Sequence, residues 1–164
     1  MKAADPDKLI HSLDEAVAWR TRAAAEGKRV VLTNGCFDLL HRGHISYLHA
    51  SAQEGDVLLV AVNSDASVRA LKGAGRPIHS EGDRAYAIAA LRCVDDTLIF
   101  EGPRLDREIA ALKPDVYTKA GDYTLDTLDP GERAALEAAG TRICLMPFVP
   151  GHSTTHLIER AAQR

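Results

Sequence analysis

The sequence is poor in the features that mark membrane-spanning, disulfide-stapled or nucleic-acid-binding proteins. Its three cysteines lie far apart without a C-x-x-C pair, so neither a disulfide framework nor a zinc site is indicated. No apolar run approaches the ~18 residues of a membrane helix, and the first residues lack the apolar region of a signal peptide. The 20 basic and 23 acidic residues give a net charge of −3, which argues against a nucleic-acid-binding protein. We therefore expect a cytoplasmic protein with buried free thiols and with neither nucleic acid nor membrane as a partner.

Two common nucleotide-binding fingerprints are also missing. No G-x-G-x-x-G follows the first predicted strand, which excludes the dinucleotide-binding signature. The pair Gly27-Lys28 is followed by Arg29 and precedes that strand, so it is not a Walker loop. No Ser-His-Asp arrangement is evident either, so hydrolysis through a serine nucleophile is not indicated.

The sequence does contain short apolar runs that alternate with longer amphipathic stretches, in a chain whose 164 residues suit one domain. We predict five strands, at residues 30–33, 57–62, 97–100, 115–118 and 142–146. Helices are predicted at residues 13–25, 45–53, 65–71, 81–91, 104–112, 131–139 and 153–162. Apolar strands that alternate with helices predict an α/β fold: a Rossmann-like, doubly wound, parallel five-stranded sheet with helices on both faces. Residues 1–27 are expected to form a helical lead-in, and residues 28–164 the domain itself.

In such a sheet, ligands bind beyond the carboxyl ends of the strands, so the loops there hold the candidate site. The first strand runs from Val30 into Thr33-Asn34-Gly35-Cys36-Phe37-Asp38, and His41-Arg42-Gly43-His44 follows where a helix begins. The unsatisfied N–H groups of a helix N-terminus attract an anion, and two histidines add donors. The histidine pair would also suit a metal, but Asp38 or a distant histidine would have to supply the third ligand.

Here the sequence resembles a known family. The stretch 33–44 is similar to the H-x-G-H signature of the HIGH-motif nucleotidyltransferases, and Gly151-His152-Ser153-Thr154-Thr155 resembles the G-x-S-T-T stretch of their cytidylyltransferase-like branch. The finer resemblance is to the adenylyltransferases that make ADP-heptose from heptose 1-phosphate. It is carried by residues 33–44, 62–68, 71–78, 119–123 and 147–155, and it covers about residues 28–159.

The resemblance implies an enzyme that transfers AMP from ATP to a sugar 1-phosphate, heptose 1-phosphate, and releases pyrophosphate during lipopolysaccharide precursor synthesis. A phosphate monoester, with its second pKa near ~6, is largely dianionic at neutral pH and needs little help from a base. The protein's task is then to hold two anions together and to stabilise charge on the α-phosphate. By resemblance the catalytic residues are His41, His44 and Lys72. The nucleotide-binding residues are Thr33, Asn34, Gly35, Cys36, Phe37, Gly43, Gly121, Asp122, Ser153, Thr154 and Thr155, and the substrate-binding residues are Asn63, Asp65, Arg76 and Arg84.

Simpler interpretations stay open for several of these residues. Asp65 and Ser153 suit helix caps, and Asp122 suits a turn. The Gly-rich stretch from Lys72 to Arg76 is, on composition alone, a surface turn rather than a lid.

Two departures from the family pattern bear on the acceptor. Ala120 stands where a glycine is expected, and a left-handed backbone there would cost it about 1 kcal/mol or more. Phe148 and Val149 occupy the region where glycerol-phosphate cytidylyltransferases carry an arginine. This difference weakens the interpretation of the chain as a glycerol-phosphate cytidylyltransferase. The alternatives are a cytidylyl- or adenylyltransferase for glycerol 3-phosphate, FMN or another phosphorylated acceptor, and a catalytically silent nucleotide-binding domain.

The implied partners are ATP and a phosphorylated small molecule, with Mg²⁺ held mainly by the triphosphate and water. No protein residue is assigned to the metal. In the family that the sequence resembles, this domain is often fused behind a sugar kinase. We expect this chain to be a stand-alone transferase, with a separate sugar kinase in the same pathway. A homodimer is a further family-level expectation.

Overall fold

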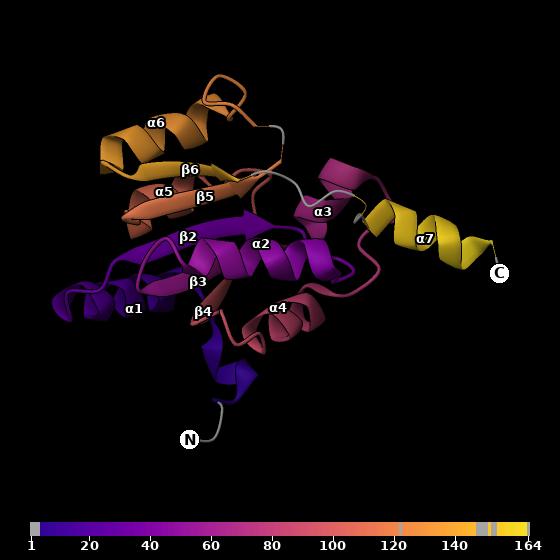
Figure 1. Cartoon of the computed structure of the whole chain (residues 1–164), viewed down its shortest axis with the longest axis horizontal. Helices are drawn as coiled ribbons and strands as arrows, with labels where there is room; N and C mark the ends of the chain where they lie inside the picture. The colour runs from indigo at the N-terminus through magenta and orange to yellow at the C-terminus, as the bar shows by residue number, and fades with distance from the viewer. Residues whose placement is uncertain (1–3, 122, 147–150, 152–153, 164) are drawn as a thin grey trace.

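The computed structural model describes residues 4–121, 123–146, 151 and 154–163. At its centre is a parallel sheet of six strands in the order β1-β4-β3-β2-β5-β6 (Figure 1). The strands are β1 (Ile10–His11), β2 (Val30–Gly35), β3 (Val57–Asn63), β4 (Asp96–Phe100), β5 (Val116–Ala120) and β6 (Arg142–Met146). The α/β, Rossmann-like class is confirmed.

The predicted count of five strands is wrong by one. The additional strand β1 has two residues and pairs with Thr97 and Leu98 at the edge of the sheet. A strand that short shows no alternation of apolar and polar side chains, so periodicity could not reveal it.

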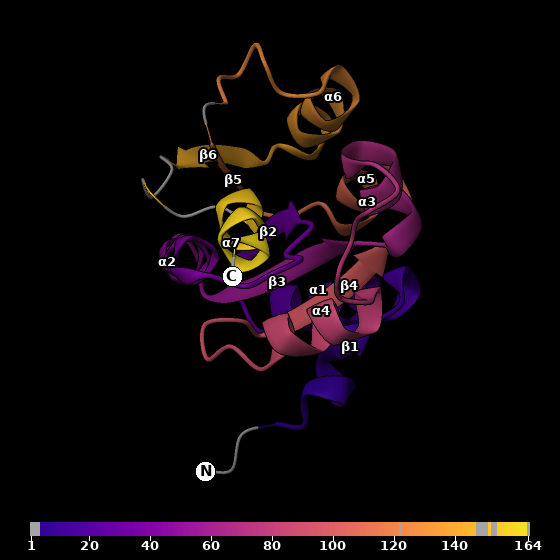
Figure 2. The ribbon, with the colours of Figure 1, turned by 90° about the vertical axis from the view of Figure 1, so that its right-hand side faces the viewer.

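Helices cover both faces of the sheet (Figure 2). The helices of the chain are α1 (Leu13–Ala25), α2 (Arg42–Ala52), α3 (Asp65–Lys72), α4 (Glu81–Ala89), α5 (Asp106–Leu112), α6 (Pro130–Ala139) and α7 (Thr154–Ala162), with a 3₁₀ turn at Pro6–Leu9. Helix α7 extends to one side of the sheet (Figure 1). Strand β3 is buried throughout, and its alternate side chains enter two different cores. Leu59 packs with residues of α1, α5 and α6, whereas Leu58 packs with residues of α2 and α4.

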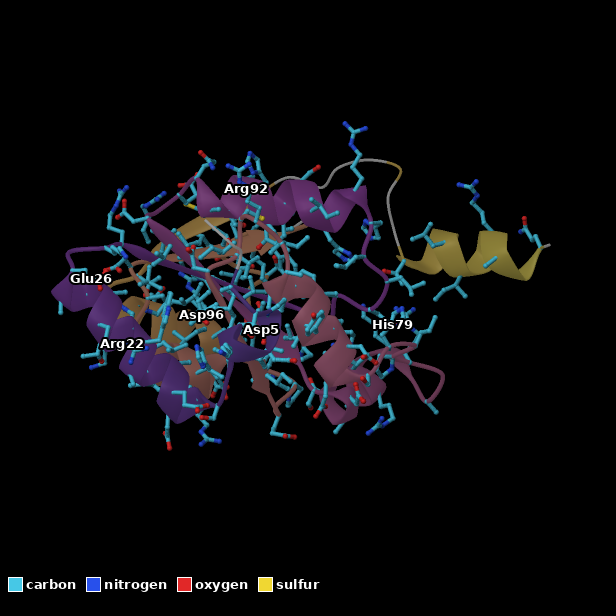
Figure 3. All side chains as sticks on the ribbon, turned by 90° about the horizontal axis from the view of Figure 1, so that it is seen from below. Asp5, Arg22, Glu26, His79, Arg92 and Asp96 are labelled. Carbon is cyan, nitrogen blue, oxygen red and sulfur yellow. The ribbon has the colours of Figure 1, made fainter. Side chains whose placement is uncertain are left out.

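The N-terminal segment joins the sheet. The Thr97 hydroxyl donates to the Leu9 carbonyl at 2.8 Å, and His11 Nε2 lies 2.8 Å from Asp96 Oδ1. Asp96 is labelled in Figure 3. Burial raises the pKa of Asp96 to about 6, with His11 opposing the shift. No helix in the described part of the chain is long and apolar enough to cross a membrane.

The order of the strands places the site. The chain builds β2, β3 and β4 toward one edge, then returns to the other side of β2 to form β5 and β6. The loops after β2 and β5 therefore leave the sheet in opposite directions and open a crevice, as at the switch point of doubly wound sheets. Thr33 and Thr118 are register partners there, so Asn34 and Lys119 come next at the carboxyl ends of neighbouring strands.

Candidate active site

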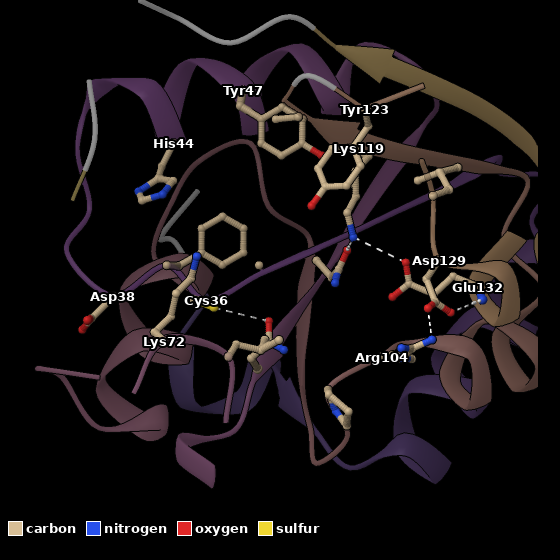
Figure 4. Close-up of a pocket in the computed structure, with 18 of the residues that line it drawn as sticks. Cys36, Asp38, His44, Tyr47, Lys72, Arg104, Lys119, Tyr123, Asp129 and Glu132 are labelled. Carbon is tan, nitrogen blue, oxygen red and sulfur yellow. Dashed lines mark hydrogen bonds and ion pairs between the residues drawn. The ribbon is translucent and has the colours of Figure 1, made fainter. Parts of the chain in front are cut away.

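A cavity of about 920 Å³ opens at this switch point (Figure 4). That volume lies near the upper end of the range for small-molecule sites. The structure brings most of the sequence-predicted site residues to it: Asn34, Gly35, Cys36, Phe37, His41, Gly43, His44, Asn63, Lys72, Arg76 and Thr154. They come from the ends of β2 and β3, from α2 and α3, from the loops that follow β2 and α3, and from the start of α7.

The histidine pair forms the entrance to helix α2. His41 is the N-cap, because its Nδ1 accepts a hydrogen bond from the His44 backbone N–H at 3.4 Å. The helix consequently begins at Arg42, three residues before the predicted start. The two imidazole rings stack with centroids 3.8 Å apart, and Phe37 meets the His44 ring edge-on at 5.4 Å.

His44 is electrically neutral at physiological pH. Burial, and to a lesser degree the neighbouring His41, lower its pKa to about 4 against the opposing influence of the Leu39 backbone. Its Nδ1 is buried and makes no hydrogen bond to any residue that the structure describes. A neutral imidazole at a helix N-terminus can donate one N–H to an anionic ligand in the cavity.

Lys72 and Arg76 supply the positive charge at this end of the cavity. Lys72 is the last residue of α3, and its exposed side chain extends into the cavity toward Cys36 (Figure 4). Burial raises the pKa of the Cys36 thiol, although Lys72 and two arginines act against the shift. The thiol is therefore protonated at neutral pH, which is unsuitable for a redox or nucleophilic cysteine.

Asp38 braces the segment that carries Arg76. Its buried carboxylate accepts from Arg76 Nε, from the Ile78 N–H at 2.8 Å and from the His79 N–H at 3.1 Å. These hydrogen bonds and the arginine keep the pKa of Asp38 below its ordinary value, although burial, the largest single influence, works the other way. The same contacts occupy both carboxylate oxygens, so Asp38 is a poor metal ligand here.

No group of three or more His, Cys, Asp or Glu side chains suited to a metal ion occurs among the described residues. The described residues therefore offer no ready-made Mg²⁺ cage. Mg²⁺ stays a prediction, as the counter-ion of a bound triphosphate.

Two predicted ligands are instead internal braces. Thr33 is fully buried, and its hydroxyl bonds to the Tyr47 hydroxyl at 2.6 Å and the Thr118 carbonyl at 3.1 Å. Arg84 has a side chain with no exposed surface and does not line this cavity, so its contact with substrate stays a prediction. Its guanidinium donates to the carbonyls of Cys36, Asn63 and His79 and to the Asp65 carboxylate.

The remaining predicted residues lie outside the cavity or outside the described residues. Asp65 pairs with Arg84 and does not cap α3; Ser64 is the cap. Gly121 does not line the cavity. Asp122 and Ser153 lie outside the described residues, as does the side chain of Thr155.

The expected strain at Ala120 is absent. Ala120 ends β5 in extended backbone, and the positive φ falls on Gly121, at +133°. The replacement of glycine by alanine is therefore tolerated at no conformational cost.

Sequence reasoning missed the opposite end of the cavity. Lys119 Nζ donates to Asn34 Oδ1 and to the Tyr117 hydroxyl, both at 3.1 Å, and pairs with Glu132 Oε2 at 3.5 Å. Tyr123, Arg104 and Asp129 line this end as well (Figure 4). Lys119 is the penultimate residue of β5 and directly follows the predicted strand 115–118, so the rule that ligands bind beyond the carboxyl ends of strands points to it. Glu132 gave no signal, because an acidic residue in the first turn of a helix is common.

Comparison with known proteins agrees with this geometry. The model of the cytidylyltransferase-like family matches residues 32–160. The chain belongs to the cytidylyltransferase-like family. This family consists of nucleotidyltransferases.

The curated relatives are longer proteins. The "Bifunctional protein HldE" of Pelobacter propionicus is 46% identical over 98% of this chain and 32% of that protein. The HldE of Geotalea uraniireducens is 47% identical over 95% of this chain and 31% of that protein. The chain thus spans about a third of the length of these relatives.

A solved structure is also similar. It is the lipopolysaccharide core biosynthesis protein of Thermoplasma volcanium, with a TM-score of 0.61 and 30% identity. The match covers 75% of this chain and 98% of that one.

Proposed function

We propose that the protein transfers AMP from ATP to a sugar 1-phosphate, heptose 1-phosphate, forming an ADP-sugar and pyrophosphate. An oxygen of the acceptor phosphate attacks the α-phosphorus and forms a new P–O bond. The bond from the α-phosphorus to the bridging oxygen breaks, and its electron pair leaves with pyrophosphate.

One observation carries this proposal. The N-terminus of α2, the stacked His41 and His44, and the ammonium group of Lys72 all face one cavity. Together they offer backbone donors, a neutral imidazole donor and a cation to the charge that builds on the α-phosphate. No base is required, since the acceptor phosphate is already ionised.

The choice of a sugar acceptor draws on the relatives. The curated ones share the name HldE, and the similar solved structure is a lipopolysaccharide core biosynthesis protein. These names support a sugar phosphate over glycerol 3-phosphate or FMN. The resemblance of residues 33–44 and 119–123 to the ADP-heptose-forming family supports the adenylyl group and heptose.

The test is pyrophosphate release by the purified protein with Mg²⁺. ATP, CTP and GTP are each combined with heptose 1-phosphate, glycerol 3-phosphate and FMN. We expect rapid release only with ATP and heptose 1-phosphate. Release with another pair would keep the reaction class and change the substrates, and tight ATP binding without any release would favour a silent binding domain.

A further inference from the structure

The cavity has two ends of different chemical character, and only one suits phosphates. Near α2, Lys72 and Arg76 outnumber the carboxylate of Asp38, and the helix N-terminus adds positive potential. At the other end each carboxylate is paired with a cation: Glu132 with Lys119, Asp129 with Arg104, and Asp126 with Arg133. This end therefore offers a polyanion no excess positive charge, whereas a neutral group rich in hydroxyls can still donate to the carboxylates.

Lys119 organises this second end and is not a free phosphate ligand. Its three N–H donors are directed at Asn34, Tyr117 and Glu132. Its side chain is only 15% exposed and that of Glu132 only 6%. Because a buried cation and a buried carboxylate need each other, the pair fixes the position of both.

The network leaves defined hydrogen-bonding groups for a ligand. Burial keeps the pKa of Tyr117 well above its ordinary range, with Glu132 adding to the effect, so its hydroxyl donates to Asn34 Oδ1 at 2.8 Å. With Oδ1 taken by Tyr117 and Lys119, the Asn34 Nδ2 group has no partner among the described residues, and Asn34 lines the cavity. Glu132 Oε1 accepts from the Leu105 N–H, while Oε2 makes only the long 3.5 Å contact with Lys119. One donor group, the Asn34 Nδ2 amide, and one acceptor, Glu132 Oε2, therefore remain for ligand hydroxyls.

An aromatic ring borders the same end. Tyr123 is 41% exposed and lies with its ring centroid 5.4 Å from Lys119 Nζ. An exposed tyrosine offers an apolar face and a polar tip, which suits the mixed surface of a pyranose ring.

We propose that this end of the cavity is the sugar-binding subsite, in which Asn34 and Glu132, held by Lys119, bond the acceptor's hydroxyls while Tyr123 packs on its ring. The inference rests on the proposed function in so far as the acceptor is a sugar phosphate. It adds which residues select the sugar, and it places the phosphate group of the acceptor at the end of the cavity near Lys72.

The test uses two variants, each of which is expected to stay folded for its own reason. In Glu132→Gln the side-chain oxygen still accepts from the Leu105 N–H, and in Tyr123→Ala an exposed side chain is removed. Glu137→Gln on the same helix and Tyr86→Ala on α4 are matched controls, because both residues are exposed and lie outside the cavity. Thermal unfolding confirms that each variant is folded.

Calorimetry then measures binding of heptose 1-phosphate and of methyl phosphate, with Mg²⁺ and a non-hydrolysable ATP analogue present. We expect wild type to prefer heptose 1-phosphate. Each subsite variant should weaken its binding about tenfold or more, with little change for methyl phosphate or the ATP analogue. The controls should behave as wild type.

Three results would overturn the subsite: unchanged sugar phosphate binding in both variants, equal loss of ATP analogue binding, or no preference of wild type for the sugar. Failure of the proposed function gives a different pattern. Wild type would then release no pyrophosphate from ATP and heptose 1-phosphate, while sugar-dependent binding would still be lost in Glu132→Gln.

Discussion

The imidazole of His41 caps the helix that carries His44, and the two rings stack with centroids 3.8 Å apart. The cap directs the helix N-terminus at the cavity, and the stacked, largely desolvated ring of His44 stays neutral. The donors for the reacting phosphate are therefore in place before any ligand binds, which is the condition for electrostatic stabilisation of a transition state.

Replacing His44 by alanine should lower kcat by about 10²–10³ and weaken ATP binding far less, since the donor acts mainly on charge that develops during reaction. Steady-state kinetics of pyrophosphate release and calorimetric ATP binding measure the two effects. His49→Ala is the control, because His49 is exposed on the same helix. A loss confined to ATP affinity would identify a binding domain rather than a catalyst.

The stability of the protein should depend on pH through His44. Its pKa is about 4 in the folded protein against 6.5 ordinarily, so the unfolded chain binds more protons between these values. Stability is then fully present above pH 6.5 and is lost as the pH falls toward 4. Urea unfolding of wild type and His44→Ala at pH 7.5 and 4.5 tests this.

The difference in the free energy of unfolding between wild type and His44→Ala should be smaller at pH 4.5 than at pH 7.5. Asp96, whose raised pKa acts in the opposite direction, is present in both proteins and cancels. An advantage that stays constant or grows on acidification would refute the neutral, desolvated His44.

Lys72→Met should reduce kcat/KM by about 10², because a cation that faces the phosphates is removed. Its exposed side chain makes no hydrogen bond or ion pair within the described residues, so the free energy of unfolding should change by less than about 0.5 kcal/mol. Kinetics and urea unfolding measure the pair of effects, with Lys28→Met as an exposed control. Unchanged kinetics would show that the Lys72 side chain is only a surface group.

Arg84→Met should destabilise the fold by about 3 kcal/mol, since it leaves three carbonyls and Asp65 without their donor. Urea unfolding measures the change, with Arg107→Met as an exposed control. At temperatures where the variant is folded, the KM for the acceptor should stay within a few fold of wild type. Retained stability with a much higher acceptor KM would restore the direct substrate contact that the sequence suggested.

The sequence was a good guide where a local pattern has one structural meaning. The apolar run 57–62 became a strand buried on both faces, because only a parallel sheet between two helical layers accommodates it. The edge strand at Ile10 and His11 was not predicted, because it pairs with β4, which is distant in the sequence, and no local pattern of apolar residues marks it. Helix α2 begins early for a comparable reason: a histidine cap is unusual, and the predicted start followed the apolar face instead.

The candidate site also has a part that a local motif predicted and a part that depends on long-range contacts. The end near His41 and His44 follows from consecutive residues at one strand and helix, so the motif alone located it. The bracing contacts of Arg84 were not predictable, because a sequence does not show that three backbone carbonyls converge on one guanidinium. The network of Lys119 and Glu132 joins β5 to α6, and neither residue signals the other until the fold brings them together.

Isotope tracing of the acceptor phosphate tests the central claim most directly. Heptose 1-phosphate carrying ¹⁸O in its phosphate is incubated with ATP, Mg²⁺ and the protein, and the products are analysed by ³¹P NMR and mass spectrometry. Attack of the acceptor oxygen on the α-phosphorus predicts label in the ADP-sugar and unlabelled pyrophosphate. Label in pyrophosphate or free phosphate, or AMP without an ADP-sugar, would contradict adenylyl transfer to the sugar phosphate.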